Sequence, residues 1–260
     1  MKFVTPTGYP KRSTLALGLS LIGITGLSLF DMKASPSMLI QAPPQLLSFL
    51  GRFLVKPDWS YLPYLLVLTL ETFLIAFVAT VFAAALSGIA ALFAARNCTP
   101  HPAIGASIRA IASVLRAIPD LLLALILASA LGLGDVPGVM ALFIATLAYL
   151  TKAYAEVLEV VGTRAIDGIR STGAHPIAIR TVGIVPQARA DLIGLTLYGL
   201  DSNLRSAAIL GAVGAGGIGY DLSAAIRHFR FDRLGMMIVS IYLAVWAVDA
   251  LSDFSRRRLE

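Results

Sequence analysis

Charged residues are scarce in this chain: they make up 14% of its 260 residues, whereas hydrophobic residues make up 57%. A soluble domain carries about 25% charged residues. The chain therefore has too little charge to cover a surface in water, and its composition indicates a protein that crosses a membrane several times.

Groups suited to metal binding or covalent catalysis are also few. Cys98 is the single cysteine, which excludes a disulfide framework and a cysteine-based metal cluster. The three histidines, His101, His175 and His228, are far apart and lack the spacing of metal ligands. We therefore expect no metal site and no catalytic residue, which argues against a membrane-embedded enzyme.

Long apolar stretches are abundant, and about 20 apolar residues suffice to cross a bilayer. The predicted spans are residues 13–30, 59–95, 107–133, 139–161, 192–213 and 234–251. They predict an all-α membrane protein with about six transmembrane helices. Residues 13–30 also resemble a signal peptide, but the apolar stretch is longer than a normal signal core, so we expect an uncleaved helix. We divide the chain into an N-terminal helix with an external, proline-bearing segment (1–58) and a transmembrane core (59–260).

The positive charges predict the orientation. The net charge is +6, and Lys and Arg cluster between the spans rather than on one basic face, which argues against nucleic-acid binding. Most of the clusters fall on one side of the predicted spans, so both termini are expected in the cytoplasm. Some basic residues fall on the external side, among them Arg227, Arg230 and Arg233.

The stretch "GAVGAGGIG" contains Gly214, Gly216 and Gly219 in the spacing of a dinucleotide-binding loop. That fold needs a strand before the glycines and a second strand within about 30 residues. The preceding apolar run is too long for a strand and suits a membrane helix. We therefore expect these glycines, with Gly217, to allow close backbone packing beside a transport pathway rather than to bind NAD.

Polar residues interrupt the span 192–213 near its middle, where charge is costly. Two interpretations stay open: Asp201 and Arg205 neutralise each other at i and i+4, or they line a polar pathway. Pro119 likewise marks either a structural kink or a gate. The candidate pathway or gate residues are Asp201, Asn203, Arg205, Ser206, Gly214, Gly216, Gly217, Gly219 and Pro119.

The polar segment "DGIRSTGAHPIAIRTVGIVPQ", residues 167–187, resembles the EAA loop of ABC importer permeases. Gly173 supplies the glycine of that pattern, Val185 and Pro186 stand at its Leu-Pro, and the nine residues after Gly173 give the correct count. Asp167, Gly168 and Ile169 replace Glu-Ala-Ala, and Gly183 replaces an isoleucine. These departures fit permeases of the phosphonate/phosphite type, whose other landmarks match most of residues 59–258. The glycine element is also similar to that of methionine-type importers.

The resemblance implies a type I permease fold in the bacterial inner membrane, with cytoplasmic coupling helices within residues 162–187. It implies that the chain pairs with an identical or similar permease, with two ATPase subunits that bind ATP and Mg, and with an external binding protein. The chain has no GxxxxGK[ST] loop, so we expect no ATP-binding cofactor site within it. The implied coupling residues are Asp167, Gly168, Arg170, Gly173, Ala174 and Pro186.

The expected cargo is a phosphonate or a related oxyanion such as phosphite or phosphate. A permease of the same family for another small solute, such as an amino acid, is the alternative. A stand-alone secondary carrier would be expected to show internal repeats, and none is evident.

Overall fold

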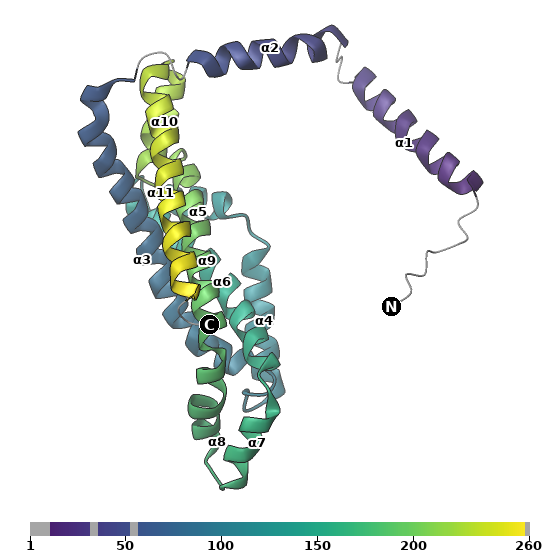
Figure 1. Ribbon diagram of the computed structural model, residues 1–260, viewed down its shortest axis with the longest axis vertical. Helices are drawn as coiled ribbons and strands as arrows, with labels where there is room; N and C mark the ends of the chain where they lie inside the picture. Colours follow the sequence, from purple (N-terminus) through teal and green to yellow (C-terminus); the bar gives the residue numbers. More distant parts are fainter. Residues whose placement is uncertain (1–10, 32–35, 53–56, 258–260) are drawn as a thin grey trace. The chain divides into compact units, whose positions relative to one another are not determined.

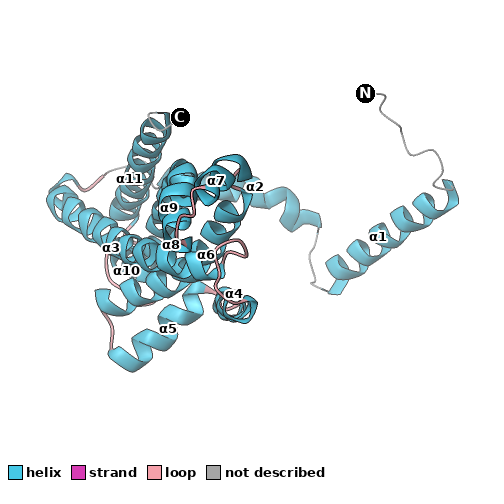
Figure 2. Cartoon of the chain, turned by 90° about the horizontal axis from the view of Figure 1, so that it is seen from below, coloured by secondary structure: helices cyan, strands magenta, loops and turns pink. Residues whose placement is uncertain are grey.

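The computed structural model describes residues 11–31, 36–52 and 57–257. These residues form helices joined by turns, with no strand among them (Figure 2). The prediction of an all-α chain is therefore confirmed over the described residues.

The chain divides into two units, Met1–Val55 and Lys56–Glu260. The first contains α1 (Lys11–Asp31) and α2 (Pro36–Arg52). Within α1, the apolar helix whose side chains are described is Ala16–Ser28, which is shorter than a membrane span requires. The predicted first span therefore stays a prediction.

The second unit is a helical bundle. Its elements are η1 (Trp59–Tyr61), α3 (Leu62–Ala94), α4 (Pro102–Arg116), α5 (Asp120–Leu131), α6 (Asp135–Val160), α7 (Thr163–Ser171), α8 (Pro176–Ala178), η2 (Ile179–Ile184), α9 (Val185–Gly211), α10 (Ile218–Arg227) and α11 (Phe231–Arg257). Figure 1 shows α7 and α8 at one end of this bundle and α10 at the opposite end. The two polar segments of the sequence thus lie at opposite ends.

The bundle is built around α3, which packs most extensively against α6. The buried face of α3 carries small side chains at helical spacing: Ala76, Ala79, Ala83, Ala91 and Ala94. Small residues let helix backbones approach closely, and in a membrane this close packing drives helix association. The many exposed Leu, Val and Phe side chains on the other faces suit a lipid environment.

Three helical spans are long and apolar enough to cross a membrane: Trp59–Ala94, Asp135–Val160 and Phe231–Phe254. The pair α4 and α5 makes a fourth if it is counted as one span broken by an 83° bend. The predicted span 192–213 is part of α9, which starts earlier, at Val185. Because α9 carries several charges, it does not meet the same criterion of apolarity. The count of six therefore stays a prediction.

One helix was missing from the sequence-based expectation. Residues 220–233 were predicted as a polar segment, but most of them belong to α10. Its Ile218 and Ala225 are buried whereas Arg227 is exposed. The helix is amphipathic and short, which explains why a search for long apolar runs passed over it.

Candidate functional site

The segment 162–187 folds as helical pieces separated by a turn. α7 ends at Ser171, and Gly173 follows with φ +74°. Only glycine adopts this backbone conformation without the strain that a Cβ brings. α8 and the π-helical η2 then lead into α9, which has Pro186 in its first turn. Gly173 therefore forms the turn after the first helix, and Pro186 starts the next long one.

The predicted coupling residues lie together on this segment. Asp167 and Arg170 form an ion pair at 3.5 Å on the exposed face of α7. Gly168, Gly173 and Pro186 are also exposed, and Ala174 is half-buried. The segment therefore presents a polar surface, and its contact with an ATPase stays a prediction.

The opposite face of the segment packs against the bundle. Ile166 and Ile184 are buried in one apolar cluster with Leu158 of α6. A Cβ added at Gly183 would lie 3.1 Å from Ile169 Cδ1. Gly183 thus leaves room for the Ile169 side chain, and a larger residue such as isoleucine at this position would require that side chain to move. The segment is therefore packed against the bundle as a continuation of it.

A set of contacts that sequence analysis did not find ties the α3–α4 turn to the end of α6. The Arg96 backbone N–H donates to Glu159 Oε1 at 2.7 Å, and Asn97 Nδ2 donates to the Leu158 carbonyl at 2.7 Å. Arg109 donates to the Ala94 carbonyl and lies 3.5 Å from Glu159. These contacts fasten α3, α4 and α6 together next to the start of α7.

The predicted glycine cluster forms a tight turn between α9 and α10. Gly214, Gly216 and Gly217 have φ of +95°, +78° and +63°. A Cβ added at Gly216 would overlap the Asp135 carboxylate, and one at Gly219 would overlap the Ala208 carbonyl oxygen. The backbone of these glycines therefore packs against α6 and α9 with no room for side chains.

Hydrogen bonds also attach this turn to α3 and α6. The Gly217 N–H donates to Glu71 Oε1 at 3.3 Å, and the Ile218 N–H donates to Thr72 Oγ1 at 2.8 Å. The Gly134 N–H, just before α6, donates to the Gly214 carbonyl at 2.8 Å. Thus the glycines join three helices at the end of the bundle opposite α7, and a role in the pathway stays a prediction.

The charged pair in α9 is local. Arg205 Nη1 donates to Asp201 Oδ1 at 2.9 Å, with Asp201 buried and Arg205 exposed. Asp249 of α11 approaches the same carboxylate. The geometry therefore agrees with one of the two interpretations of the sequence, in which Asp201 and Arg205 neutralise each other. Ser206 is half-buried beside this pair.

Asn203 lies on a different face of α9, because two residues correspond to about 200° around a helix. Its Nδ2 donates to Thr80 Oγ1 at 2.8 Å and approaches Thr146 Oγ1 at 2.7 Å, and Thr146 donates to Asn203 Oδ1 at 2.9 Å. All three residues are buried. This network joins α3, α6 and α9 through polar side chains whose hydrogen bonds are satisfied within the bundle.

Pro119 lies at the bend between α4 and α5, where it is the N-cap residue of α5. Its ring cannot supply an N–H to continue a helix from α4. The bend is therefore a structural break, and the last residue before it in a helix is Arg116.

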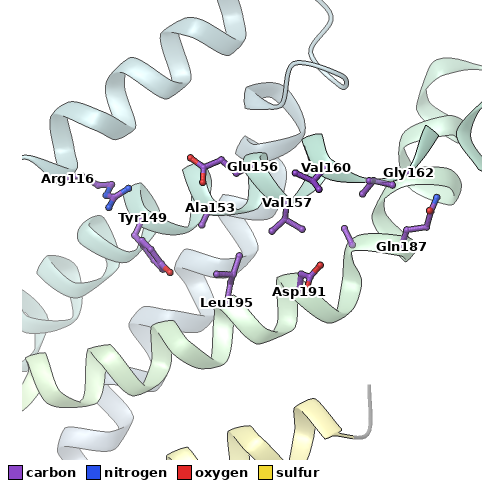
Figure 3. A pocket seen from close by; sticks show the side chains of 12 residues that line it. Arg116, Tyr149, Ala153, Glu156, Val157, Val160, Gly162, Gln187, Asp191 and Leu195 are labelled. Carbon is purple, nitrogen blue, oxygen red and sulfur yellow. The ribbon is translucent and has the colours of Figure 1, made fainter. Parts of the chain in front are cut away.

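Two cavities open beside this bend. The larger, of about 690 Å³, lies between α6 and α9 and is shown in Figure 3. Arg116 and Tyr149 lie at one of its ends, and Gly162 and Gln187, which border the segment 162–187, lie at the other (Figure 3). The smaller, of about 220 Å³, is lined by Asn203, Asp120 and Tyr198, and also by Arg116 and Tyr149.

Sequence analysis missed Arg116 and Tyr149 as candidate site residues. Arg116 lies three residues before Pro119 at the end of an apolar stretch, and Tyr149 is one aromatic position within a predicted span. Their meeting depends on the packing of α4 against α6, which no local pattern indicates. Of the predicted pathway residues, Asn203 lines the smaller cavity.

The end of the bundle near α10 carries a separate set of charges. Asp58 Oδ2 accepts a hydrogen bond from Arg233 Nε at 3.1 Å, and Arg230 pairs with Asp232 at 3.0 Å. Hydrogen bonds from Ser60 and Arg233 lower the pKa of the Asp58 carboxyl, so it stays ionised at neutral pH. Two of the three arginines that the sequence analysis noted on the external side are therefore already paired with carboxylates.

Within the described residues, no group of three or more His, Cys, Asp or Glu side chains is placed to hold a metal ion. The Cys98 thiol is buried in the α3–α4 turn, and burial raises its pKa. It is therefore a packing residue with little thiolate character.

A family model described as "Binding-protein-dependent transport system inner membrane component" matches residues 87–260. The chain is 40% identical over 189 residues to the phosphate-import permease protein PhnE of Mycolicibacterium smegmatis, covering 73% of this chain but 36% of that protein. It thus spans about a third of the length of that relative. It is 32% identical over 210 residues to the putative phosphite transport system permease protein HtxC of Stutzerimonas stutzeri, covering 81% of this chain and 74% of HtxC.

Among solved structures, the chain is similar to the MetNI methionine ABC transporter in inward-facing conformations. The TM-score is 0.68 at 19% identity, over 78% of this chain and 99% of the matched chain. An amino acid ABC transporter matches with a TM-score of 0.65 at 17% identity, over 76% and 95% of the two chains. These likenesses concern the fold, and they confirm the predicted type I permease architecture.

Proposed function

This chain belongs to the family of binding-protein-dependent transport system inner membrane components, and on that premise we propose that it forms the membrane pathway of an ATP-driven importer of phosphorus oxyanions. The cargo is phosphonate, phosphite or phosphate. The relatives' names support this class of cargo. The observation that carries the proposal is the position of the larger cavity, which ends at Gly162 and Gln187, beside the segment 162–187.

The energy source is a separate ATPase pair. The chain has no phosphate-binding loop of the GxxxxGK[ST] type, so ATP and Mg are bound by those partner subunits. The exposed face of α7 with Asp167 and Arg170 contacts the ATPase. Because Ile166 and Ile184 anchor the same segment in the bundle, movement of the ATPase is passed to α6 and α9.

The remaining partners complete the importer. A second permease chain, identical or similar, closes the pathway on the side that a single bundle leaves open. An external binding protein delivers the oxyanion at the end of the bundle that carries α10. Both termini and the segment 162–187 face the cytoplasm, as the distribution of Lys and Arg predicts.

Reconstitution tests the proposal. The permease is purified with the ATPase and binding protein of the same transport system, placed in liposomes, and supplied with internal ATP and external ³²P-phosphate, phosphite or methylphosphonate. We expect ATP-dependent accumulation of at least one of these anions, and none when the ATPase is left out. Methionine serves as the control cargo. Accumulation of methionine but of none of the three anions would contradict the proposed cargo, and accumulation without ATPase would contradict the importer mechanism.

A further inference from the structure

Arg116 and Tyr149 are the two residues at which the cavities described above meet. Both residues line the larger cavity and the smaller one. Arg116 is the last residue of α4, just before the bend at Pro119, and it lines both spaces. A solute that moves through these two cavities from the Asn203 side toward the segment 162–187 passes this pair.

The Arg116 guanidinium is held by an aromatic ring rather than by a carboxylate. Its Cζ lies 5.6 Å from the centroid of the Tyr149 ring. It takes part in no ion pair within the part of the chain that the structure describes. A cation–π contact stabilises the position of the charge without using up the N–H groups at the edge of the guanidinium. Those donors remain free for a ligand.

Tyr149 is itself supported from the other side. Its ring lies 6.1 Å, centroid to centroid, from that of Tyr198 of α9, which lines the smaller cavity. The three side chains therefore bridge α4, α6 and α9. A guanidinium held in this way is a rigid, planar donor that matches two oxygens of a tetrahedral oxyanion at once.

Carboxylate side chains line the same two cavities as the Arg116 guanidinium. Asp120 lines the smaller cavity, and Glu156 and Asp191 line the larger one. Glu156 follows Tyr149 by seven residues on α6, which corresponds to about 10 Å along the helix. An anion that leaves Arg116 toward Gly162 therefore meets negative charge, which disfavours a long stay at that end.

We propose that Arg116, supported by Tyr149, is the residue that binds the phosphorus–oxygen group of the anion in transit, and that Glu156 and Asp191 promote its release toward the segment 162–187. This proposal rests on the proposed oxyanion cargo. It assigns binding to a residue outside the Asp201–Arg205 pair, whose charges neutralise each other.

The test compares uptake with ATP hydrolysis in the reconstituted complex. Arg116→Gln removes the charge but keeps a hydrogen-bonding side chain of similar shape, and Arg96→Gln makes the same change at an exposed arginine outside both cavities. We expect Arg116→Gln to lower phosphite uptake about tenfold or more, as the loss of a charge-assisted contact does. Binding-protein-stimulated ATP hydrolysis stays within about twofold of wild type, and Arg96→Gln stays normal in both assays.

A second variant separates charge from structure. Arg116→Cys is made together with Cys98→Ala and treated with a thiol reagent that adds an ammonium group, or with one of similar length that adds a sulfonate. We expect the ammonium adduct to regain uptake and the sulfonate adduct to stay inactive. This comparison holds even if Arg116→Gln assembles poorly, because both adducts are made on the same folded protein.

Three results would overturn the proposal while the oxyanion function stands: uptake by Arg116→Gln within twofold of wild type, parallel loss of uptake and ATP hydrolysis in an Arg116→Gln complex that assembles at the wild-type yield, or equal recovery with both reagents. A wild-type complex that transports none of phosphate, phosphite and methylphosphonate would instead overturn the proposed cargo, and this proposal with it.

Discussion

Two glycine-dependent turns flank α9, and they differ in their surroundings. Gly173, in the turn before it, has φ +74°, and Gly216, in the turn after it, has φ +78°. A Cβ at Gly173 would meet open space, whereas one at Gly216 would overlap the Asp135 carboxylate. The first turn needs glycine for its backbone conformation alone, and the second needs it for conformation and for space.

The two turns differ in what surrounds them: the Gly173 turn is exposed, whereas the turn around Gly216 connects helices of the bundle. The Gly173 turn projects from the bundle, so its shape is free to fit a partner. The turn around Gly216 is bonded to α3 through Glu71 and Thr72, so it holds helices of the same chain together. The same residue type at nearly the same φ therefore occurs in an exposed turn in one place and in internal packing in the other.

The largest expected effect concerns which side of the membrane each turn faces. In a Cys98→Ala background, Leu133→Cys, next to the glycine turn and 74% exposed, should react fully with a membrane-impermeant thiol reagent applied outside intact cells. Ser171→Cys, next to Gly173, should react only after the membrane is opened. External labelling of Ser171→Cys in intact cells would place both turns on one side and refute the proposed orientation.

A smaller but still severe effect is expected from Gly216→Ala. Left-handed strain and overpacking together cost roughly 2–5 kcal/mol, so the yield of folded permease and its Tm in detergent should fall markedly. The matched control is Gly132→Ala, because Gly132 has φ +89° with open space around its Cβ position. Gly132→Ala should lower the stability of the folded permease only by the backbone strain, about 1–2 kcal/mol. Equal Tm values for the two variants would show that space is not limiting at Gly216.

The smallest effect is expected from Gly173→Ala. The strain of about 1–2 kcal/mol falls on an exposed turn, so the Tm of the bundle should hardly change. The dissociation constant for the ATPase should rise about fivefold or more, because the turn no longer keeps the partner-binding shape. Gly162→Ala is the control, since its φ of −61° tolerates any residue and its Cβ position is open. An unchanged dissociation constant for Gly173→Ala would argue against the turn as the coupling element.

Much of the helical architecture follows from composition and periodicity. Residues 59–94 contain no cluster of turn residues, and they form η1 and the single helix α3. The sequence also located the break at Pro119 and the glycine at the turn after α7. Prediction from the sequence failed where helical residues are not part of a long apolar run. The short helix α10 was passed over. The helix α9 begins seven residues before the predicted span, because Val185 to Asp191 are too polar to resemble a membrane span.

The candidate site was less predictable. The coupling segment is a continuous stretch with a pattern of its own, so its residues were found together. The contact of Arg116 with Tyr149 joins positions 33 residues apart in sequence and depends on the packing of α4 against α6. Asp201 and Arg205 attracted notice because charge is rare in a span, but their spacing on one helix also let them pair with each other. A local sequence pattern identifies such residues, but it does not show which cavity their side chains face.

The charges of α9 have a consequence for how the protein is made. Asp201 and Arg205 lie within the apolar part of this helix, and each such residue costs about 2.5–3.5 kcal/mol when it enters the centre of a bilayer from the translocon. α3 and α6 leave the ribosome earlier and carry Thr80 and Thr146, the hydrogen-bond partners of Asn203. We therefore expect α9 to enter the bilayer more readily once α3 and α6 are inserted, because their threonines supply hydrogen bonds to Asn203 that lipid lacks.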